Sequence, residues 1–521
     1  MNKTFIVSAE AIPNPNSRYT TQDLLFFFLC LTLSVIYIQW LWSRRKLYTY
    51  ALKIHGPISL PIVGCFYLFI TQPTEIYKNL MYLFEKYSGL SRGWFGPQLF
   101  FLVQNPKHID IILSSPKALG KPYLYDKIVQ FVGTGILTAP VPKWRKHRKL
   151  IRPTFNQRIL DQFVEIFSEQ CGVLMKCLGK EVGKEVDLFH YLTKLTLDVL
   201  CETAMGIKVN AQTTDSVFGK WIDRAMEITM FRMLNVWYHF DFIFNFTPLK
   251  KEYDDINHKF HAFTGKVVKD KITAYKNKME DIDDRTESEV EVTGNRKAFL
   301  DYLIDIAYNQ KDSMLTEQEI REEVDIFMVA GTDTTATSLC FTFMVLGIYP
   351  EIQQKIYEEV VDVIGYTGSV ESKDLPKLKY AECVLKETQR FFAPAPAIAR
   401  ELTDDLDLGD VTLPSGCSIV VGVIKVHRNP EYWNDPMKFD PDRFLPENAK
   451  KIVPGSYLPF SWGPRNCAGP KYAMMAMKTV VANVVRKYQI SCGYKNIEEV
   501  DLKCNLLLRS TEGFKVTFHK R

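Results

Sequence analysis

The longest apolar run of the chain lies near its N-terminus. Residues 24–42 are nineteen consecutive uncharged and mostly apolar residues, with Trp40 and Trp42 at the end. As a helix this run would span about 28 Å, which is enough to cross the hydrocarbon core of a bilayer. A basic triplet at 44–46 follows at once, and tryptophan favours the membrane interface. The pattern therefore predicts a membrane-spanning helix.

Two other interpretations of this run are open. A cleaved signal peptide would have a shorter apolar core, preceding charges and a small-residue cleavage site, and a buried helix is rarely uncharged on every face. An uncleaved signal anchor fits best, and the positive-inside rule then places residues 44–46 and the rest of the chain in the cytosol. We expect a lumenal segment at 1–23, the anchor at 24–42, a basic and Pro-rich linker at 43–64, and one large domain at 65–521.

Beyond the anchor, the hydrophobic pattern is mainly helical. Residues 155–273 hold several amphipathic helical patterns, and residues 326–343 form a long pattern that is apolar on most faces. Residues 66–113 alternate helical and strand-like patterns, and residues 514–518 are strand-like. The prediction is a mostly α fold with a minor β portion.

Composition narrows the class of protein. The 521 residues are 46% hydrophobic and 24% charged, which is typical of a globular protein, and the net charge of +5 does not by itself indicate nucleic-acid binding. Length alone would allow about three domains, but no Gly/Ser/Pro-rich linker divides the chain. The eleven cysteines show no C-x-x-C spacing, which argues against a disulfide framework or a zinc site and favours a reducing compartment.

One cysteine stands apart because of its neighbours. In the stretch 460–469 (FSWGPRNCAG), Cys467 follows an arginine, lies between two glycines and precedes a helical pattern at 471–487. The positive end of a helix dipole favours a thiolate, and glycine lets a flat ligand approach the backbone closely. A lone cysteine is usually a small buried hydrophobe, but the spacing F-x-x-G-x-R-x-C-x-G fixes five residue types. The pattern indicates a single soft axial ligand to a haem iron.

This stretch resembles the haem-binding signature of the cytochromes P-450, which are haem-thiolate monooxygenases. The resemblance covers nearly the whole chain, with five motifs in the family's order. It implies the P-450 fold and a haem b that is held non-covalently apart from the Cys467 thiolate. It also implies an NADPH–cytochrome P-450 reductase as electron donor, with cytochrome b5 as a second candidate. The chain itself shows no flavin or dinucleotide fingerprint.

A tryptophan and an arginine precede this signature at helical spacing. Trp144 and Arg148 are four residues apart and share a helix face, so that both can donate to one carboxylate. The resemblance implies that this carboxylate is a haem propionate and that Arg400 and Arg465 are further propionate partners. Three more cations flank the pair: Arg145, Lys146 and Lys149. Two interpretations of these three residues are open: they form a solvated basic face of the helix, or they form a surface that attracts an acidic electron donor.

The pattern at 326–343 carries a second group of chemical interest. Gly331 and three threonines within five residues are poor for helix stability, and a threonine hydroxyl can bond the preceding turn and bend the helix. Such a bend beside a cofactor would make room for O2. Asp333 and Thr334 form an acid–alcohol pair that can relay protons through ordered water. Taken alone, the same pattern fits a structural helix with a buried, paired aspartate.

The sequence of this segment narrows the resemblance to one clan of the family. Residues 323–335, with the pattern E-V-D-x-F-M-x-x-G-x-D-T-T, resemble the family-4 clan, which is best known for fatty-acid ω-hydroxylases. The motifs together resemble an insect microsomal member. Many family-4 members have a glutamate directly before the glycine, where it can esterify the haem. Ala330 stands there in this chain, so an ester through this position is ruled out and ω-selectivity does not transfer directly.

The remaining motifs have structural interpretations. Glu387 and Arg390 are three residues apart and can pair on one helix face. The resemblance implies that this pair is buried, is joined by Arg443 and fixes the segment that presents Cys467. For His427, contact with the haem edge and a packing or capping role are both open.

The substrate cannot be read from the sequence, but the segments that shape the pocket are expected. They are residues 117–137, 231–246, 395–398 and 506–510. Residues 231–246 are unusually aromatic, and a core segment, the roof of an access channel and a patch touching the bilayer are all open for them.

The sequence therefore predicts a haem-thiolate monooxygenase of the endoplasmic reticulum membrane. It would insert one oxygen atom of O2 into a fatty acid, a hormone-like lipid or a xenobiotic, with no nucleic-acid partner. Two alternatives are an O2-independent isomerase or dehydratase of oxygenated lipids and a non-catalytic haem-binding lipid carrier. The predicted cofactor-binding residues are Trp144, Arg148, Ala330, Gly331, Arg400, Phe460, Gly463, Arg465, Cys467 (the metal ligand) and Gly469. The predicted catalytic residues are Asp333 and Thr334, and the structural ones are Glu387, Arg390 and Arg443.

Overall fold

The computed structural model describes residues 21–60, 63–71, 75–214, 216–283, 297–309 and 315–521. Residues 1–20 of the predicted lumenal segment and residues 61–62 of the predicted linker lie outside this part of the chain. Two compact units are distinguished, residues 1–53 and residues 54–521.

The first unit consists of two helices, α1 (Thr21–Ser43) and α2 (Arg45–Ala51). The segment Gln22–Ser43 of α1 is long and apolar enough to cross a membrane. Its large apolar side chains are mostly exposed, among them Leu25, Phe26 and Phe27. An exposed apolar surface of this extent needs a partner, as the predicted anchor would have in a bilayer.

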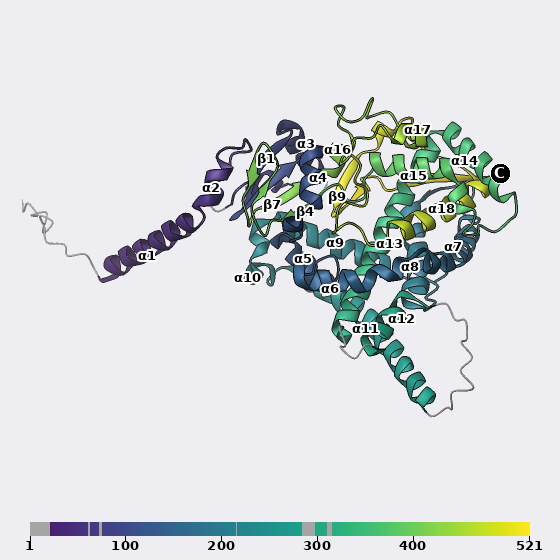
Figure 1. The fold of residues 1–521 in the computed structure, drawn as a ribbon, viewed down its shortest axis with the longest axis horizontal. Helices are drawn as coiled ribbons and strands as arrows, with labels where there is room; N and C mark the ends of the chain where they lie inside the picture. Colours follow the sequence, from purple (N-terminus) through teal and green to yellow (C-terminus); the bar gives the residue numbers. More distant parts are fainter. Residues whose placement is uncertain (1–20, 61–62, 72–74, 215, 284–296, 310–314) are drawn as a thin grey trace, which may run out of the picture. The chain divides into compact units, whose positions relative to one another are not determined.

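Helices dominate the second unit (Figure 1). The longest are α7 (Gln157–Leu178), α11 (Pro248–Asp283), α13 (Glu317–Ile348) and α18 (Pro470–Lys487). The shorter ones are α3 (Ile76–Lys86), α4 (Pro106–Ser114), α5 (Asp126–Val132), α6 (Val141–Ile151), α8 (Leu188–Leu200), α9 (Phe218–Leu234), α10 (Asp241–Phe244), α12 (Phe299–Asn309), α14 (Pro350–Ile364), α15 (Lys379–Phe391), α16 (Val423–His427) and α17 (Pro446–Ala449). Single turns include η1 (Phe66–Phe69), η3 (Pro116–Ala118), η4 (Tyr123–Tyr125), η5 (Arg152–Phe155), η7 (Val236–His239), η8 (Leu375–Lys377), η9 (Pro441–Phe444), η10 (Ile497–Glu499) and a π-helical turn, η6 (Cys201–Met205).

The strands form small sheets. The largest has the order β1-β2-β7-β4, in which β2 and β7 are parallel and the other neighbours antiparallel. A three-stranded sheet has the order β3-β11-β8, and β9-β10 and β5-β6 are pairs. The strands are β1 (Leu90–Phe95), β2 (Gln98–Val103), β3 (Glu185–Asp187), β4 (Ile398–Glu401), β5 (Leu406–Asp407), β6 (Thr412–Leu413), β7 (Ser418–Val421), β8 (Tyr488–Ser491), β9 (Leu502–Asn505), β10 (Leu507–Ser510) and β11 (Lys515–Lys520). The mostly α fold with a minor β portion that the sequence predicts is confirmed.

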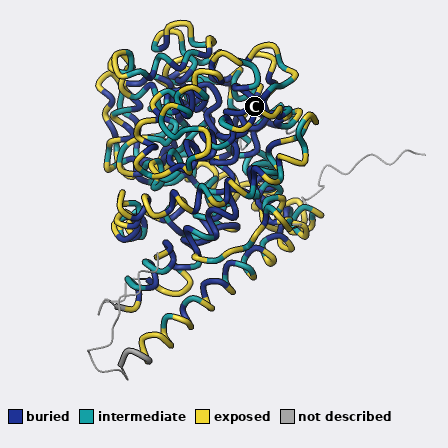
Figure 2. Tube along the Cα trace, turned by 90° about the vertical axis from the view of Figure 1, so that its right-hand side faces the viewer, coloured by how far each residue is buried: buried dark blue, intermediate teal, exposed yellow. Residues whose placement is uncertain are grey.

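Helix α13 joins the two large hydrophobic cores of the second unit. Its N-terminal half, from Ile320 to Met328, packs into one core, and its C-terminal half, from Ala336 to Leu346, packs into the other. The stretch between these halves belongs to neither buried cluster. Figure 2 shows the buried segments gathered inside this unit. The middle of α13 is therefore held rigidly at both ends while one face stays available to line a site.

Helices α8 and α13 pack closely at a glycine. A Cβ on Gly331 would lie 2.8 Å from Cδ1 of Leu200, which is closer than real Cβ atoms come to a neighbour. One turn away, the hydroxyl of Thr196 in α8 donates to the carbonyl of Thr332 at 3.0 Å. The helix-weakening residues at 331–332 thus serve the packing of α13 against α8, and the assigned helix continues through them.

Candidate active site

A cavity of about 580 Å³ lies in the second unit. Most of its lining side chains are apolar and come from β2, α5, α9, α13, β4, the 458–469 loop and the segment between β9 and β10. The residues predicted from the sequence that line it are Trp144, Arg148, Ala330, Gly331, Thr334, Arg400, Phe460, Arg465, Cys467 and Gly469. Of the predicted cofactor-binding and catalytic residues, Gly463 and Asp333 are not part of the lining, and the three predicted structural residues, Glu387, Arg390 and Arg443, also lie outside it.

The loop that carries Cys467 is held by its own backbone. The N–H of Cys467 donates to the carbonyl of Phe460 at 2.9 Å. Gly463 has φ = +74°, and a Cβ there would lie 1.9 Å from the carbonyl oxygen of Leu113. Glycine is required at this position for both reasons. The loop then ends at Gly469, which precedes the first turn of α18.

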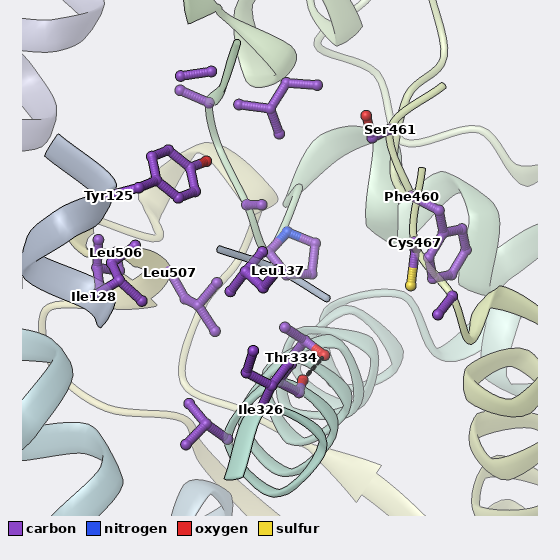
Figure 3. A pocket seen from close by; sticks show the side chains of 18 of the residues that line it. Tyr125, Ile128, Leu137, Ile326, Thr334, Phe460, Ser461, Cys467, Leu506 and Leu507 are labelled. Atoms are coloured by element: carbon purple, nitrogen blue, oxygen red, sulfur yellow. Dashed lines mark hydrogen bonds between the residues drawn. The ribbon is translucent and has the colours of Figure 1, made fainter. Parts of the chain in front are cut away.

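The sulfur of Cys467 faces the cavity. The residue is exposed, and its free surface belongs to the cavity lining (Figure 3). Burial raises the pKa of the Cys467 thiol, while the N–H of Gly469 and the cation of Arg148 lower it. The Gly469 N–H lies 3.4 Å from the sulfur. The protein thus offers the sulfur a donor and a nearby positive charge.

A second cysteine, Cys504 in β9, also lines the cavity. It is only 3% exposed, and burial raises its pKa to about 12. Cys504 therefore stays a thiol, and Cys467 is the better metal ligand of the two, because thiolate is the form that binds metals.

Four cationic side chains line the cavity: Lys121, Arg148, Arg400 and Arg465. No Asp or Glu side chain lines it, and none of the four forms an ion pair within the described part of the chain. Burial lowers the pKa of Arg400, and burial together with Arg400 lowers that of Arg465 to about 10. Buried positive charge without a counterion is unfavourable. The lining is therefore suited to an anionic ligand.

Hydrogen bonds to the backbone hold these arginines in place. Arg465 donates to the carbonyls of Leu119 and Ala139, the second at 2.6 Å. Arg400 donates to the hydroxyl of Ser461 at 3.1 Å and to the carbonyl of Arg465 at 3.2 Å. These bonds tie β4, the residues around 119 and 139, and the 458–469 loop into one wall.

Helix α6 brings a tryptophan and an arginine to the same wall. The ring of Trp144 lies under the Arg465 guanidinium, whose centre is 5.2 Å from the ring centroid. Arg148 donates to Oδ1 of Asn466 at 2.6 Å, next to Cys467. His147, on the next turn after Trp144, fastens α6 to α13, because its Nδ1 lies 2.5 Å from Oε1 of Glu323. The indole N–H of Trp144 has no partner among the described residues.

Helix α13 contributes a hydroxyl to the cavity. Thr334 lines it, and its Oγ1 donates to the carbonyl of Ala330 one turn earlier at 2.6 Å (Figure 3). Because this hydroxyl still has acceptor capacity, it can take a hydrogen bond from a ligand in the cavity.

Asp333 lies outside the cavity lining, although the next residue, Thr334, is part of it. Its two carboxylate oxygens each accept a bond of 2.6 Å from Arg509 of β10, and only 2% of the residue is exposed. Arg509 also donates to Thr337 at 2.6 Å and reaches Asp223 of α9 at 3.5 Å. The acid of the predicted acid–alcohol pair is therefore enclosed by an ion pair.

The Glu387–Arg390 pair is fully buried. Arg390 donates to both carboxylate oxygens of Glu387, at 2.7 and 2.8 Å. Nε of Arg443 lies 3.4 Å from the same carboxylate, and the N–H of Asp440 donates to it at 2.9 Å. The pair thus connects α15 to the segment around η9.

His427 extends this buried cluster towards the Cys467 loop. Its Nε2 accepts from the N–H of Leu458 at 2.7 Å, so its Nδ1 carries the proton and donates to the carbonyl of Arg390 at 3.1 Å. Burial lowers the pKa of His427 to about 3, with Arg390 acting in the same direction. His427 does not line the cavity. Its contacts are those of a neutral packing residue.

The donor set fits a haem. Cys467 offers one soft ligand at one wall, and Trp144 and the cations offer donors to an anionic edge. The long apolar lining suits the flat macrocycle and an apolar substrate. No carboxylate side chain competes for the metal within the lining, and the buried Cys504 thiol is a weaker ligand than Cys467.

The comparisons with known proteins decide the family. The sequence model described as Cytochrome P-450 matches residues 54–518. This chain belongs to the cytochrome P-450 family. It is 33% identical over 490 residues to cytochrome P-450 4c3 of Drosophila melanogaster, which covers 92% of this chain and 91% of the relative. It is 34% identical over 468 residues to cytochrome P-450 4V2 of Mus musculus, with 89% of each chain covered.

The solved structures agree at the level of the fold. A crystal structure of the cytochrome P-450DA haem domain matches with a TM-score of 0.76 at 21% identity, covering 90% of this chain and 98% of that chain. The predicted family, including its family-4 relatives, is confirmed, and so is the prediction of a cytochrome P-450 monooxygenase. The family implies a haem-iron cofactor, O2, a redox partner and a lipophilic substrate in general.

Sequence reasoning missed part of this P-450's cavity. All four segments expected to shape the cavity contribute to its lining. Residues outside these segments also line it, among them Phe100 of the largest sheet, Ile76 of α3 and Thr203 of the π-helical turn η6. The sequence carried no local signal for these residues, since each is apolar or small in an ordinary helical or strand pattern. Lys121 lies within the expected segment 117–137, but no motif assigns it a role.

The aromatic segment 231–246 separates into two parts. Phe244 is fully buried, whereas Trp237, Phe240, Phe242 and Phe246 are 56%, 49%, 67% and 89% exposed. None of these five lines the cavity, so these aromatics are not its roof. The exposed four form a surface that favours the bilayer interpretation over the core interpretation.

The buried ion pair predicts a large stability effect. Replacing Arg390 by Met should lower the free energy of unfolding by about 3–5 kcal/mol, because the buried Glu387 carboxylate loses its partner. Urea unfolding followed by circular dichroism measures this. The double variant Glu387→Gln/Arg390→Met is the control and should recover part of the loss. A loss of less than about 1 kcal/mol in the single variant, as for a surface pair, would contradict this structural role.

The neutral state of His427 predicts a pH dependence. The folded protein resists protonating this ring until about pH 3, whereas the unfolded chain takes up the proton near pH 6.5. Stability should therefore fall as the pH drops below about 6.5, with up to about 1.4 kcal/mol per pH unit from this residue. In His427→Gln this part of the slope should vanish, while His519→Gln, at an exposed histidine, should keep it. Equal slopes in all three proteins would refute the assignment.

Proposed function

We propose that this cytochrome P-450 inserts one oxygen atom of O2 into a C–H or C=C bond of a lipophilic substrate, using electrons that NADPH–cytochrome P-450 reductase supplies. The observation that carries the proposal is that one apolar cavity is lined both by the accessible sulfur of Cys467 and by Thr334 of α13. The size and apolar lining of the cavity support a fatty acid, a hormone-like lipid or a lipophilic xenobiotic as substrate.

When bound, the haem supplies the iron at which O2 is activated, and the Cys467 thiolate favours cleavage of the O–O bond. The residues that would hold it are Cys467 at the metal and Trp144, Arg148, Arg400 and Arg465 at the carboxylates. The 458–469 loop and the start of α18 would hold the sulfur at the wall of the cavity. Ala330 offers no side-chain oxygen, so the haem stays non-covalent apart from the thiolate.

The protein must also deliver protons. We assign the hydroxyl of Thr334 the role of holding a water molecule within the cavity, since it can accept a hydrogen bond while donating to Ala330. Asp333 is the proposed proton source. Because Arg509 covers both of its oxygens, Asp333 can act only after Arg509 turns towards Asp223.

The electron donor and the membrane follow from surface features. Arg145 and Lys149 are exposed on α6. This is the helix whose Arg148 donates to Asn466, the residue before Cys467. This basic face supports docking of an acidic reductase domain, with cytochrome b5 as a second donor. Helix α1 and the basic residues after it support a single-pass protein of the endoplasmic reticulum with a cytosolic catalytic domain.

One observation favours an O2-independent isomerase or dehydratase: Asp333 is outside the cavity lining. Turnover with isotopically labelled O2, NADPH and reductase separates the two functions. The monooxygenase predicts one labelled oxygen atom in the product, the other in water, and no product when NADPH is omitted. Product formed without NADPH and without label would instead establish the isomerase class. Haem binding without turnover of any lipid class would leave the non-catalytic haem-binding lipid carrier as the remaining function.

The proposed role of Thr334 gives a second prediction. Thr334→Ala should keep NADPH consumption within about threefold but cut the product formed per NADPH by about tenfold, because proton delivery is worth at least that much. The control is Thr342→Ala, which removes an equivalent bond to a carbonyl one turn earlier, at 2.7 Å, away from the cavity. Full coupling in Thr334→Ala would exclude the role.

A further inference from the structure

Lys121 is a cavity residue that none of the motifs includes. It follows η3 and is half-buried, with the cavity on its free side. Hydrogen bonds hold the two residues before it. Arg465 donates to the carbonyl of Leu119, and the N–H of Glu401 donates to the carbonyl of Gly120 at 2.9 Å. A Cβ on Gly120 would lie 2.7 Å from the carbonyl oxygen of Glu401. The backbone of Lys121 is thus held against the strand that carries Arg400.

Lys121 differs from the other cations of the cavity. Arg148, Arg400 and Arg465 all donate to protein oxygens. The ammonium of Lys121 donates no hydrogen bond to any described residue and only lies over the ring of Tyr125, 4.3 Å from its centroid. All three of its N–H donors are available to a ligand.

The surroundings of Lys121 lack a compensating charge. Its pKa is lowered well below the usual value by burial first, and then by Arg400 and Arg465. Asp126 follows Lys121 on the next stretch of chain and Glu401 follows Arg400 in β4, and burial raises the pKa of both. Within the described residues, neither forms an ion pair with Lys121. The protein therefore places an ammonium beside two guanidinium groups and leaves the counterion to come from outside the chain.

We propose that Lys121 is a carboxylate-binding residue of this cavity, which it shares with Arg400 and Arg465. The inference rests on the proposed function, because it takes the cavity to hold a haem and a lipophilic substrate. A carboxylate can come from two sources there, a haem propionate or an acidic substrate. Either carboxylate would accept hydrogen bonds from the free N–H groups of Lys121. Its negative charge would also offset the repulsion between Lys121 and the two arginines.

The test uses the full-length haem protein and three variants. Lys121→Met keeps the length of the side chain and removes its charge, and Lys121→Gln serves if the first variant folds poorly. Lys121→Arg keeps the charge. The matched control is Lys117→Met, four residues earlier, where the side chain is 44% exposed, pairs with Asp404 and does not line the cavity.

Two measurements distinguish the sources of the carboxylate. The first is the rate at which haem transfers from the ferric protein to apomyoglobin. The second is a spectral titration with dodecanoic acid and with 1-dodecanol, which differ in charge but not in chain length. If Lys121 holds a propionate, Lys121→Met should transfer haem about tenfold faster, which corresponds to 1.4 kcal/mol. If it holds the substrate, the preference for the acid over the alcohol should fall about tenfold.

Either effect supports the proposal, provided that Lys121→Arg restores it at least in part and Lys117→Met lacks it. Unchanged haem transfer and unchanged acid preference in a folded Lys121→Met or Lys121→Gln would overturn it. A wild-type protein that binds no haem would overturn the proposed function itself, and so the two failures are distinguishable.

Discussion

The cavity is organised by positive charge that the protein buries without a counterion. Arg400 and Arg465 are 3% and 7% exposed, and Lys121 lies beside them. Groups of like charge at such positions destabilise the fold unless something compensates them. The chain compensates in part by directing the two guanidinium groups at backbone carbonyls. Those same bonds join β4, the residues before Lys121 and the Cys467 loop, so that the anion site and the metal ligand are built as one piece.

The opposite wall is built differently. Helix α13 is anchored in two separate cores and lines the cavity with its central part, from Ile326 to Ser338. Gly331 lets α8 approach, and Thr334 presents a hydroxyl. Asp333 points its charge into an ion pair with Arg509 on β10. The wall that faces Cys467 is therefore stable without any ligand, and proton delivery through Asp333 requires one ion pair to rearrange.

The sequence predicts the features that are encoded at fixed local spacing. Cys467 with its glycines, Trp144 with Arg148, and Glu387 with Arg390 each lie within one loop or one helix, so one segment is enough to recognise them. Lys121 and Arg509 could not be predicted in this way. Lys121 acquires its environment from β4, almost three hundred residues later, and Arg509 reaches Asp333 from a strand near the C-terminus. Residues 231–246 show a third limit, since aromatic density alone does not distinguish a buried side chain such as Phe244 from exposed ones.

The central claim is that Cys467 binds a haem iron as a thiolate in this cavity. The carbon monoxide difference spectrum of the reduced, full-length protein tests it most directly. The account predicts the long-wavelength Soret band of a thiolate-bound haem in the wild-type protein and its loss in Cys467→Ala, with Cys504→Ala unchanged. A wild-type spectrum without that band, or a band that survives in Cys467→Ala, would contradict it.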